Sequence, residues 1–430
     1  EVRGVFSLSD YRCLHQRDGE NIQKLMKSLD EKMTEKYPDG FTQEDIKYAE
    51  LDNDKVVEIN YTSGTTGFSK GVMLTGNNLA GNVTYARTLD LLFRGERELC
   101  FLPLAHAYSC AFNLLVPMAF GVHVYLLGKV PSPKILLKAF EEVKPNLILM
   151  VPLILEKIYK KMILPQLNKR TLKLALNIPL LDSRIYAQIR KHLVDALGRF
   201  REVIVGGAAM NQEVTDFLYK IKFPFTIGYG MTECGPLISY DHNNEYVPGS
   251  CGQILKGIMK VRIDSEDPYN KVGEIQVSGE NVMKGYYKND EATQNVFTED
   301  GWLRTGDLGT IDHDNRIFIR GRSKTMILGA SGQNIYPEEI ESKLNNLPFV
   351  MESLVVEKNG KLIGMVYPDY DTVDSTGISH TDLPVIMEQN RIELNKLLAP
   401  YETISEIQLY PTEFEKTPKK SIKRYLYSNY

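Results

Sequence analysis

The 430-residue chain lacks the features that mark several common classes of protein. It has no internal repeat and no low-complexity tract. Its five cysteines are scattered, and no two of them form a Cys-x-x-Cys pair. An odd, dispersed set disfavours a disulfide framework and a zinc ribbon, and it favours a reducing compartment. We therefore predict a cytoplasmic location.

A strong net charge is also missing. The chain carries 51 Lys and Arg against 55 Asp and Glu, which gives a formal net charge of −4. That balance provides no general case for nucleic-acid binding. One local exception is the segment 416–424, KTPKKSIKR, in which five of nine residues are cationic.

No apolar run is long and unbroken enough to predict a membrane span. The most apolar stretch, 112–128, is interrupted by Asn113, Pro117 and His123, so it predicts a buried helix followed by a strand. Peripheral contact with a membrane surface stays open. The chain begins EVRGVFSLSDY, without Met or a visible signal peptide, and this opening resembles the interior of a domain. We expect a fragment of a longer protein.

Apolar runs that alternate with helical patterns predict an α/β fold. Residues 1–50 are charged and largely helical in pattern, most clearly over 21–37. From Val56 to about Gly230 the alternation indicates a sheet with covering helices. The strand-like runs are 98–104, 122–127, 146–152, 201–207 and 224–230, and helical periodicity occupies 152–167 and 183–198.

The pattern of apolar and turn residues changes after Gly249. Short strands at close spacing over 260–321 predict a small antiparallel β unit. From Lys324 onward the pattern predicts a small α+β unit with a charged helix around 382–398. We therefore predict a large domain, 1–323, of α/β sheet layers plus the small β unit, followed by a small domain, 324–430.

Residues 61–72, YTSGTTGFSKGV, concentrate small hydroxyls and glycines around a single lysine. We interpret them as a loop between a strand over 56–59 and a helix capped by Asn77 or Asn78. Backbone N–H groups and hydroxyls in such a loop can surround an anion, and Lys70 adds positive charge. The spacing is not that of a Walker loop. A flexible linker is the alternative, although linkers rarely follow a buried strand so closely.

Six sequence blocks in one order carry a resemblance to a known family. They are YTSGTTGFSKG (61–71), FLPLAHAY (101–108), GGAAM (206–210), GYGMTECGP (228–236), GWLRTGDLG (301–309) and GRSKTMILGASGQNIYPEEIE (321–341). Each block alone is weak. Together they resemble the adenylate-forming superfamily, which includes acyl-CoA synthetases, luciferases and the adenylation domains of peptide synthetases. The matches extend over most of the chain, from about Val56 to Arg424.

The resemblance implies a two-step reaction. A carboxylate attacks the α-phosphate of ATP and releases pyrophosphate, and a thiol, usually coenzyme A, then takes the acyl group from the acyl-adenylate. Because charge builds on the phosphoryl oxygens, catalysis needs positive and hydrogen-bonding groups. The residues that would hold the β- and γ-phosphates are Thr62, Ser63, Gly64, Thr65, Thr66, Gly67 and Lys70.

The resemblance also implies three catalytic roles in the large domain. Thr232 would hydrogen-bond the α-phosphate, and Glu233 would hold Mg²⁺, a hard cation that takes carboxylate oxygen. His106 would lie at the carboxylate pocket. Taken from the residues alone, Glu233 is more typical of a solvated cap, and His106 is as typical of a satisfied core histidine.

The remaining large-domain residues would bind the nucleoside. The family places an aromatic ring against one face of adenine and a small-residue loop on the other, with an aspartate accepting hydrogen bonds from both ribose hydroxyls. An arginine also contacts the ribose. The matching residues here are Tyr229, Gly230, Gly207, Ala208, Asp307 and Arg322. Without the neighbouring blocks, Asp307 would be read as a turn residue.

The resemblance also implies roles for two lysines of the predicted small domain, one at its start and one near its end. Lys324 aligns with the hinge about which the family's carboxy-terminal domain rotates as a lid, although an exposed lysine also suits plain solvation. The family ends with a lysine that reaches the carboxylate and the α-phosphate. Ungapped alignment places Ser421 there, so we assign the role to Lys420, with Lys419 as the second candidate.

Two departures from the family pattern remain. Ser69 stands where the family usually has proline, which changes stiffness and not charge. Relatives also have a longer stretch before the phosphate loop, so the large domain is expected to be amino-terminally incomplete.

The acid is not specified by a motif. The character of 101–121 and the hinge lysine resemble long-chain fatty acyl-CoA synthetases, which predicts ATP, Mg²⁺, a fatty acid and coenzyme A as the small-molecule partners. Two alternatives stay open. One is acyl transfer to acyl carrier protein, which the basic tail, residues 416–424, could contact. The other is a nucleotide-binding fragment without catalysis.

Overall fold

A computed structural model of the chain describes residues 4–7, 10, 12–17, 21–47, 52–63, 69–128, 131, 133–167, 169–178, 181–328, 333–416 and 422–427. Its contacts divide the chain into two units, Glu1–Asp52 and Asn53–Tyr430. The boundary predicted at 323–324 stays a prediction.

The first unit begins with strands and continues with helices. β1 (Gly4–Phe6) and β2 (Cys13–Gln16) form an antiparallel hairpin, and α1 (Ile22–Lys27), α2 (Leu29–Lys36) and the short η1 (Gln43–Asp45) follow. The helical prediction over 21–37 is confirmed. The largely helical reading of 1–50 is wrong before residue 17, because β1 and β2 pair with each other.

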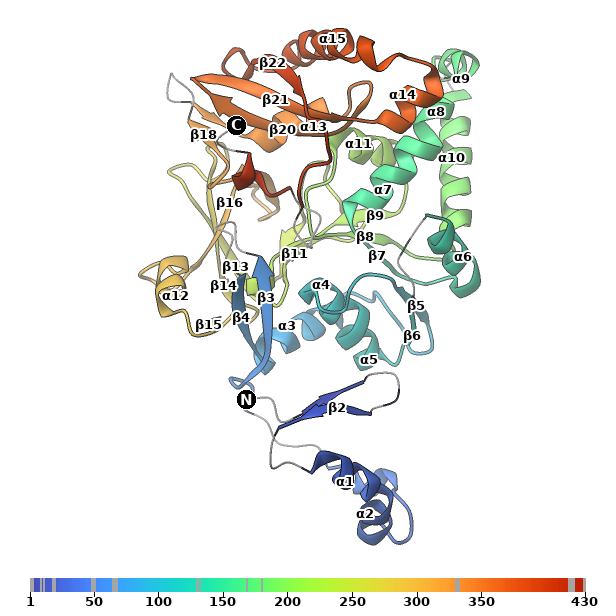
Figure 1. Ribbon diagram of the computed structural model, residues 1–430, viewed down its shortest axis with the longest axis vertical. Coiled ribbons are helices and arrows are strands. Elements are labelled where there is room, and N and C mark those ends of the chain that lie inside the picture. The colour runs from blue at the N-terminus through green and yellow to red at the C-terminus, as the bar shows by residue number, and fades with distance from the viewer. Residues whose placement is uncertain are drawn as a thin grey trace. The chain divides into compact units, whose positions relative to one another are not determined.

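Parallel strands run through the second unit (Figure 1). β5 (Arg97–Cys100) pairs with β6 (His123–Leu126), and β8 (Val203–Val205) lies between β7 (Ile148–Met150) and β9 (Phe225–Ile227). A bridge from Glu98 to Leu147 joins the two sets. β7 and β8 are buried along their whole length, which explains their wholly apolar sequences. The α/β prediction is confirmed.

The two faces of these strands belong to different apolar clusters, because side chains alternate along a strand. Ile148 and Val203 pack with helices in one cluster, whereas Leu149 and Ile204 join a second cluster on the other face. The helices of the first cluster are α6 (Pro133–Val143), α7 (Pro152–Ile158), α10 (Leu181–Leu197) and α11 (Gln212–Lys220). The predicted helix over 152–167 is continuous from α7 through η3 (Tyr159–Ile163) into α8 (Leu164–Leu167), with α9 (Arg170–Ala175) after it.

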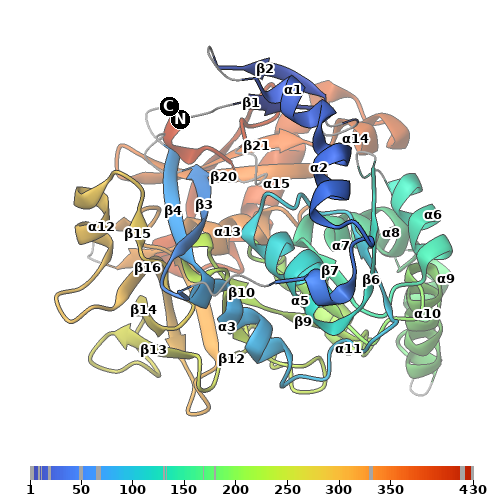
Figure 2. The same cartoon turned by 90° about the horizontal axis from the view of Figure 1, so that it is seen from below.

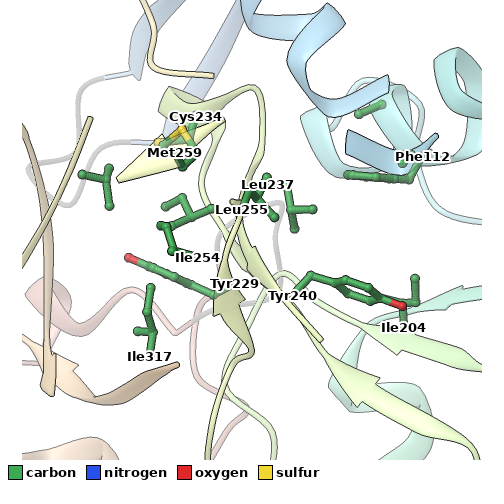
Figure 3. Close-up of a cluster of buried hydrophobic side chains, with 14 of the residues drawn as sticks. Phe112, Ile204, Tyr229, Cys234, Leu237, Tyr240, Ile254, Leu255, Met259 and Ile317 are labelled. Carbon is green, nitrogen blue, oxygen red and sulfur yellow. The ribbon is translucent and has the colours of Figure 1, made fainter. Parts of the chain in front are cut away.

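The second cluster contains Tyr229, one of the residues predicted to bind the nucleoside (Figure 3). Tyr229 lies there beside Ile254 and Ile317. Strands β10 (Tyr229–Gly230), β11 (Leu237–Tyr240) and β12 (Gln253–Ile254) form a small antiparallel sheet. The apolar run 112–128 forms a helix and then strand β6, as predicted, through α4 (Ala107–Ser109), η2 (Cys110–Leu115) and α5 (Val116–Phe120).

The region that the sequence predicts to bind phosphate includes a strand hairpin. β3 (Val56–Ser63) pairs antiparallel with β4 (Ser69–Thr75), and α3 (Gly76–Ala86) begins only after β4 (Figure 2). The predicted strand–loop–helix order is therefore wrong, because residues 69–75 pair with β3. The helix cap is also different from the prediction, since the Thr75 side chain accepts the N–H of Asn78.

The predicted antiparallel β unit is confirmed. Its strands lie in the order β13 (Met259–Asp264), β14 (Gly273–Gly279), β16 (Leu303–Ile311) and β17 (Ile317–Arg322). The short β15 (Gly285–Tyr286) follows β14 in the chain, belongs to another sheet and pairs with β4, next to α12 (Asp290–Val296). This pairing places Tyr286 beside the β3–β4 hairpin.

The carboxy-terminal α+β unit also forms as predicted. β20 (Val350–Lys358), β21 (Lys361–Pro368) and β22 (Ile404–Leu409) make a mixed sheet. Helices α13 (Pro337–Leu344) and α15 (Leu383–Asn395) pack into one apolar cluster with it, and Phe414 and Tyr427 form another with Leu354 and Met365. The shorter elements are β18 (Ile327–Leu328), β19 (Asn334–Ile335) and α14 (Tyr370–Thr376). Within the described parts of the chain, no helix has the length and apolar character needed to cross a bilayer.

Candidate nucleotide-binding and catalytic site

Three predicted site residues follow the carboxyl ends of parallel strands. His106 comes after β5, Gly207 after β8 and Tyr229 after β9. Because Val205 pairs with Ile227, the segments after β8 and β9 leave the sheet at the same edge. Gly207 has a φ of +90°, a conformation that favours glycine. In open α/β sheets this edge is where ligands bind.

Tyr229, Asp307 and Arg322 are in direct contact. The Tyr229 hydroxyl donates a 2.7 Å hydrogen bond to Oδ2 of Asp307, and Arg322 Nε lies 3.1 Å from Oδ1. Asp307 and Arg322 are directly opposite each other on β16 and β17. Asp307 is buried, with 7% exposure, whereas the Arg322 side chain is 61% exposed. Three of the predicted nucleoside-binding residues therefore form one cluster.

The electrostatics of this cluster keep the phenol neutral. Burial, and then the negative charge of Asp307, raise the pKa of Tyr229 well above its usual value. The phenol therefore remains a hydrogen-bond donor at neutral pH. It fixes one oxygen of Asp307, and Arg322 neutralises the other from the solvent side.

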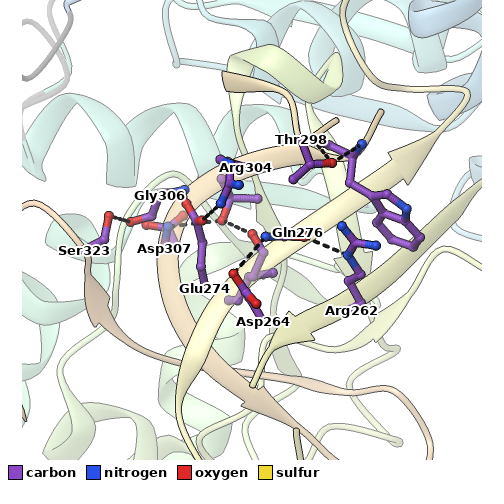
Figure 4. Close-up of polar contacts among 12 residues, drawn as sticks. Arg262, Asp264, Glu274, Gln276, Thr298, Arg304, Gly306, Asp307 and Ser323 are labelled. Carbon is purple, nitrogen blue, oxygen red and sulfur yellow. Dashed lines mark hydrogen bonds and ion pairs between the residues drawn. The ribbon is translucent and has the colours of Figure 1, made fainter. Parts of the chain in front are cut away.

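The backbone around Asp307 is held by a second layer of polar contacts (Figure 4). The Asp307 N–H donates to the Thr305 hydroxyl at 3.1 Å, and that hydroxyl donates to the Ile275 carbonyl at 2.7 Å. The Gly306 N–H donates to Glu274 at 3.2 Å, and the Gly306 carbonyl accepts the Ser323 N–H at 2.9 Å. These bonds fix the strand position from which Asp307 projects.

Thr232 and Glu233 lie on a buried turn, the one-turn helix η4 (Thr232–Cys234). Asn82 of α3 holds the end of this turn, because its amide donates to the Gly235 carbonyl at 2.7 Å and its carbonyl accepts the Leu237 N–H at 3.1 Å. Gly235 has a φ of +58°. Glu233 is only 9% exposed, so the solvated-cap reading does not describe it.

Glu233 and Lys70 both contact Tyr286, a residue that the sequence analysis did not single out. The Tyr286 hydroxyl donates to Oε1 of Glu233 at 2.9 Å. Lys70 Nζ lies 4.7 Å from the centre of the same tyrosine ring, within cation–π range. Thr62 is directly opposite Lys70 in the β3–β4 hairpin, and Ser63 is opposite Ser69. Predicted residues Gly64, Thr65, Thr66 and Gly67 lie outside the described residues.

The other predicted residues are not all brought to this cluster. His106 caps the start of α4, and the neighbouring Ala105 carbonyl accepts the Asn60 amide at 3.0 Å. Lys324 is exposed in the turn after β17. Lys419 and Lys420 lie outside the described residues. The chain on either side of them is paired, because Lys416 and Ile422 form an antiparallel bridge.

Glu233 is the predicted metal ligand, and its surroundings suit a magnesium ion that is shared with phosphate. No group of three or more metal-binding side chains occurs in the described part of the chain. Mg²⁺ in nucleotide sites commonly takes one or two carboxylates, with phosphates and waters as the other ligands. A single buried carboxylate near the β3–β4 hairpin fits that mode.

Sequence reasoning missed Tyr286 and Asn82. Asn82 was inside a predicted helix, and nothing in its neighbours signals that it reaches Gly235. Tyr286 sits in KGYYKND, where neither tyrosine is distinguished. Only the pairing of β15 with β4 shows which of the two faces the hairpin lysine.

Comparison with known proteins identifies the family of this chain. A family model described as AMP-binding enzyme matches residues 8–287. A 4-coumarate–CoA ligase of Humulus lupulus is 32% identical over 396 residues, covering 88% of this chain and 65% of the relative. A long-chain-fatty-acid–CoA ligase of Rattus norvegicus is 27% identical over 337 residues, covering 72% of this chain and 50% of the relative. The chain thus spans about half to two thirds of the length of these relatives.

A solved structure shares the fold. The O-succinylbenzoate coenzyme A synthetase of Bacillus subtilis, in complex with ATP and a magnesium ion, superposes with a TM-score of 0.67. It is 23% identical, and the match covers 89% of this chain and 72% of that one. At this identity the likeness concerns the fold alone.

Proposed function

Because the chain belongs to the AMP-binding enzyme family, we propose that it activates a carboxylic acid with ATP and transfers the acyl group to coenzyme A. The contact of Tyr229 and Arg322 with the buried carboxylate of Asp307 carries this proposal. It provides a charged, oriented acceptor at the ligand-binding edge of the sheet. Two vicinal ribose hydroxyls are donors that suit such an acceptor.

In the first step an oxygen of the acid forms a bond to the α-phosphorus, and the bond from that phosphorus to pyrophosphate breaks. Thr232 hydrogen-bonds the α-phosphate, and Lys70 with the β3–β4 hairpin receives the pyrophosphate oxygens. Tyr229 and the Gly207–Ala208 segment take the adenine. His106 lies toward the acid. In the second step the thiolate of coenzyme A attacks the acyl carbon and AMP leaves.

Glu233 would hold the magnesium ion. When bound, this ion neutralises charge on the phosphate oxygens. The part played by the chain is to keep the carboxylate buried and oriented, through the turn fixed by Asn82 and the hydrogen bond from Tyr286.

The carboxy-terminal unit would act as the mobile lid, with Lys324 at the hinge and Lys420 as the lysine that reaches the reacting carboxylate. Its separate apolar clusters support an independently folded body. Its described contacts with the large domain include polar ones, such as Lys160 Nζ donating to the Asn345 carbonyl at 2.8 Å. Polar contacts of this kind suit an interface that opens.

For the acid, we propose a fatty acid, and within that class a long-chain one. The resemblance of 101–121 and the matching long-chain-fatty-acid–CoA ligase support it. The 4-coumarate–CoA ligase among the relatives makes an aromatic acid the main competitor.

The test incubates the 430-residue chain with ATP, Mg²⁺, coenzyme A and a panel of acids, and mass spectrometry then identifies the acyl-CoA products. The panel runs from short to long fatty acids and includes 4-coumarate. We expect long-chain acyl-CoA to dominate. Predominant 4-coumaroyl-CoA would replace the fatty-acid assignment. Acyl-AMP that accumulates without acyl-CoA would point to another acceptor, such as acyl carrier protein.

A further inference from the structure

Tyr286 contacts both charged groups of the phosphate site. Its hydroxyl donates to Oε1 of Glu233 at 2.9 Å, and its ring lies under Lys70 Nζ at 4.7 Å from the centroid. Among the described residues, no ion pair joins Lys70 directly to Glu233. The tyrosine therefore stands between the cation and the anion and touches each by a different part of its side chain.

The position of this ring is fixed by the fold. Tyr286 is 4% exposed and pairs with Val72 of β4. Its N–H donates to the Thr293 hydroxyl of α12 at 2.9 Å. The preceding Gly285 has a φ of +143°, and a Cβ there would meet Thr293 Cγ2 at 2.8 Å. The close approach of α12 and the pairing with β4 thus hold the tyrosine from two sides.

Each contact has a definite physical effect. A phenol that donates to one carboxylate oxygen orients the other, so the carboxylate no longer rotates freely. The negative face of the ring attracts the lysine ammonium and limits its rotamers. From this geometry we propose that Tyr286 is a positioning residue that presents Glu233 to the magnesium ion and Lys70 to the terminal phosphates. The inference rests on the proposed function.

Three variants separate the two contacts. Tyr286→Phe removes the hydroxyl and keeps the ring under Lys70. Tyr286→Leu removes both. Tyr287→Phe is the matched control, because Tyr287 is the next residue and is 42% exposed. Circular dichroism and the unfolding temperature without ligand establish that each variant folds.

The measurement is the shift in unfolding temperature caused by the β,γ-imido analogue of ATP, in EDTA and across a magnesium titration. For Tyr286→Phe we expect the EDTA shift to match the parent. The magnesium concentration for half of the additional shift should rise about tenfold, as expected when a hydrogen bond to a charged group is lost. Tyr286→Leu should in addition weaken analogue binding in EDTA about threefold, while AMP, which lacks the terminal phosphates, binds as in the parent.

The magnesium titration of Tyr286→Phe decides whether Tyr286 is a positioning residue. A magnesium titration equal to that of the parent and of Tyr287→Phe would make Tyr286 a packing residue and overturn the inference. A parent chain that the analogue does not stabilise would overturn the proposed function and this inference together, and that failure is distinguishable because it appears before any substitution is made.

Discussion

The phenol of Tyr229 donates a 2.7 Å hydrogen bond to the carboxylate of Asp307, although the two residues are 78 positions apart in the chain. The bond joins the end of the parallel sheet to the antiparallel β unit. Arg322 completes the contact from the neighbouring strand β17. The site thus depends on the packing of the antiparallel β unit against the parallel sheet.

Asp307→Asn should weaken nucleotide binding without unfolding the protein. The amide keeps an acceptor for Tyr229 but loses the charge that a ribose hydroxyl would meet, so we expect affinity for AMP to fall about tenfold or more. The unfolding free energy should change by about 1 kcal/mol or less, since Arg322 is largely exposed. Isothermal titration with AMP and a denaturant melt measure the two quantities. Asp264→Asn, an exposed change in the same sheet, serves as the control.

Glu233→Gln should separate binding from chemistry. The glutamine still accepts the Tyr286 hydrogen bond but no longer attracts a divalent cation. We expect adenylation to fall about a hundredfold or more, and the ATP analogue to bind in EDTA as in the parent. Quenched-flow measurement of acyl-AMP formation gives the rate. Equal rates in variant and parent would remove Glu233 from the reaction.

The basic tail provides a third prediction. Lys420→Ala should abolish acyl-adenylate formation and spare the transfer of an acyl group from pre-made acyl-adenylate to coenzyme A. Lys419→Ala should have a much smaller effect, because the reaction needs one cation at this position and we assign that role to Lys420. A larger loss in Lys419→Ala would exchange the two assignments. Loss in neither would assign the cation to Lys423, Lys70 or another residue.

A fourth prediction concerns stability and pH. Glu98 is fully buried on β5, hydrogen-bonded by Asn113, and its Oε2 has no hydrogen-bond partner among the described residues. Burial raises its pKa to about 8. The folded state therefore holds the proton more tightly than the unfolded state. The associated stability is fully present below the unfolded pKa and is lost as the pH rises to about 8.

Glu98→Gln should remove this loss, because the amide does not ionise. We expect the variant to match the parent near pH 4 and to be more stable at pH 8, by on the order of 2 kcal/mol. Urea melts at a series of pH values provide the comparison, with the exposed Glu266→Gln as the control. A stability difference that is the same at every pH would show that ionisation of Glu98 plays no part.

The sequence predicted the elements that local patterns encode. Apolar runs that include Ile148–Met150 and Val203–Val205 indicated strands of an α/β sheet, and short strands at close spacing indicated the antiparallel unit. The family blocks predicted Tyr229, Asp307 and Arg322 as nucleoside-binding residues, and the fold brings the three into contact. The strand over 69–75 was missed because its short apolar stretch does not reveal a partner. Pairing with β3 is a tertiary contact.

The same limit explains the site residues that were missed. Tyr286 reaches Lys70 only because β15 pairs with β4, and no local pattern encodes that contact. Asn82 supports the Gly235 turn from α3, and the predicted helix did not indicate this contact. Residues that act through long-range contacts carry no signature in their immediate neighbours.

We propose above all that this chain joins a carboxylic acid to AMP. Acid-dependent exchange of labelled pyrophosphate into ATP tests it most directly, because exchange requires the forward and reverse adenylation steps and no acceptor thiol. We predict that label enters ATP only when ATP, Mg²⁺ and a suitable acid are present together, and that fatty acids support the fastest exchange. A folded chain that binds the ATP analogue yet shows no exchange with any fatty or aromatic acid would contradict the account and leave a nucleotide-binding protein without this catalysis.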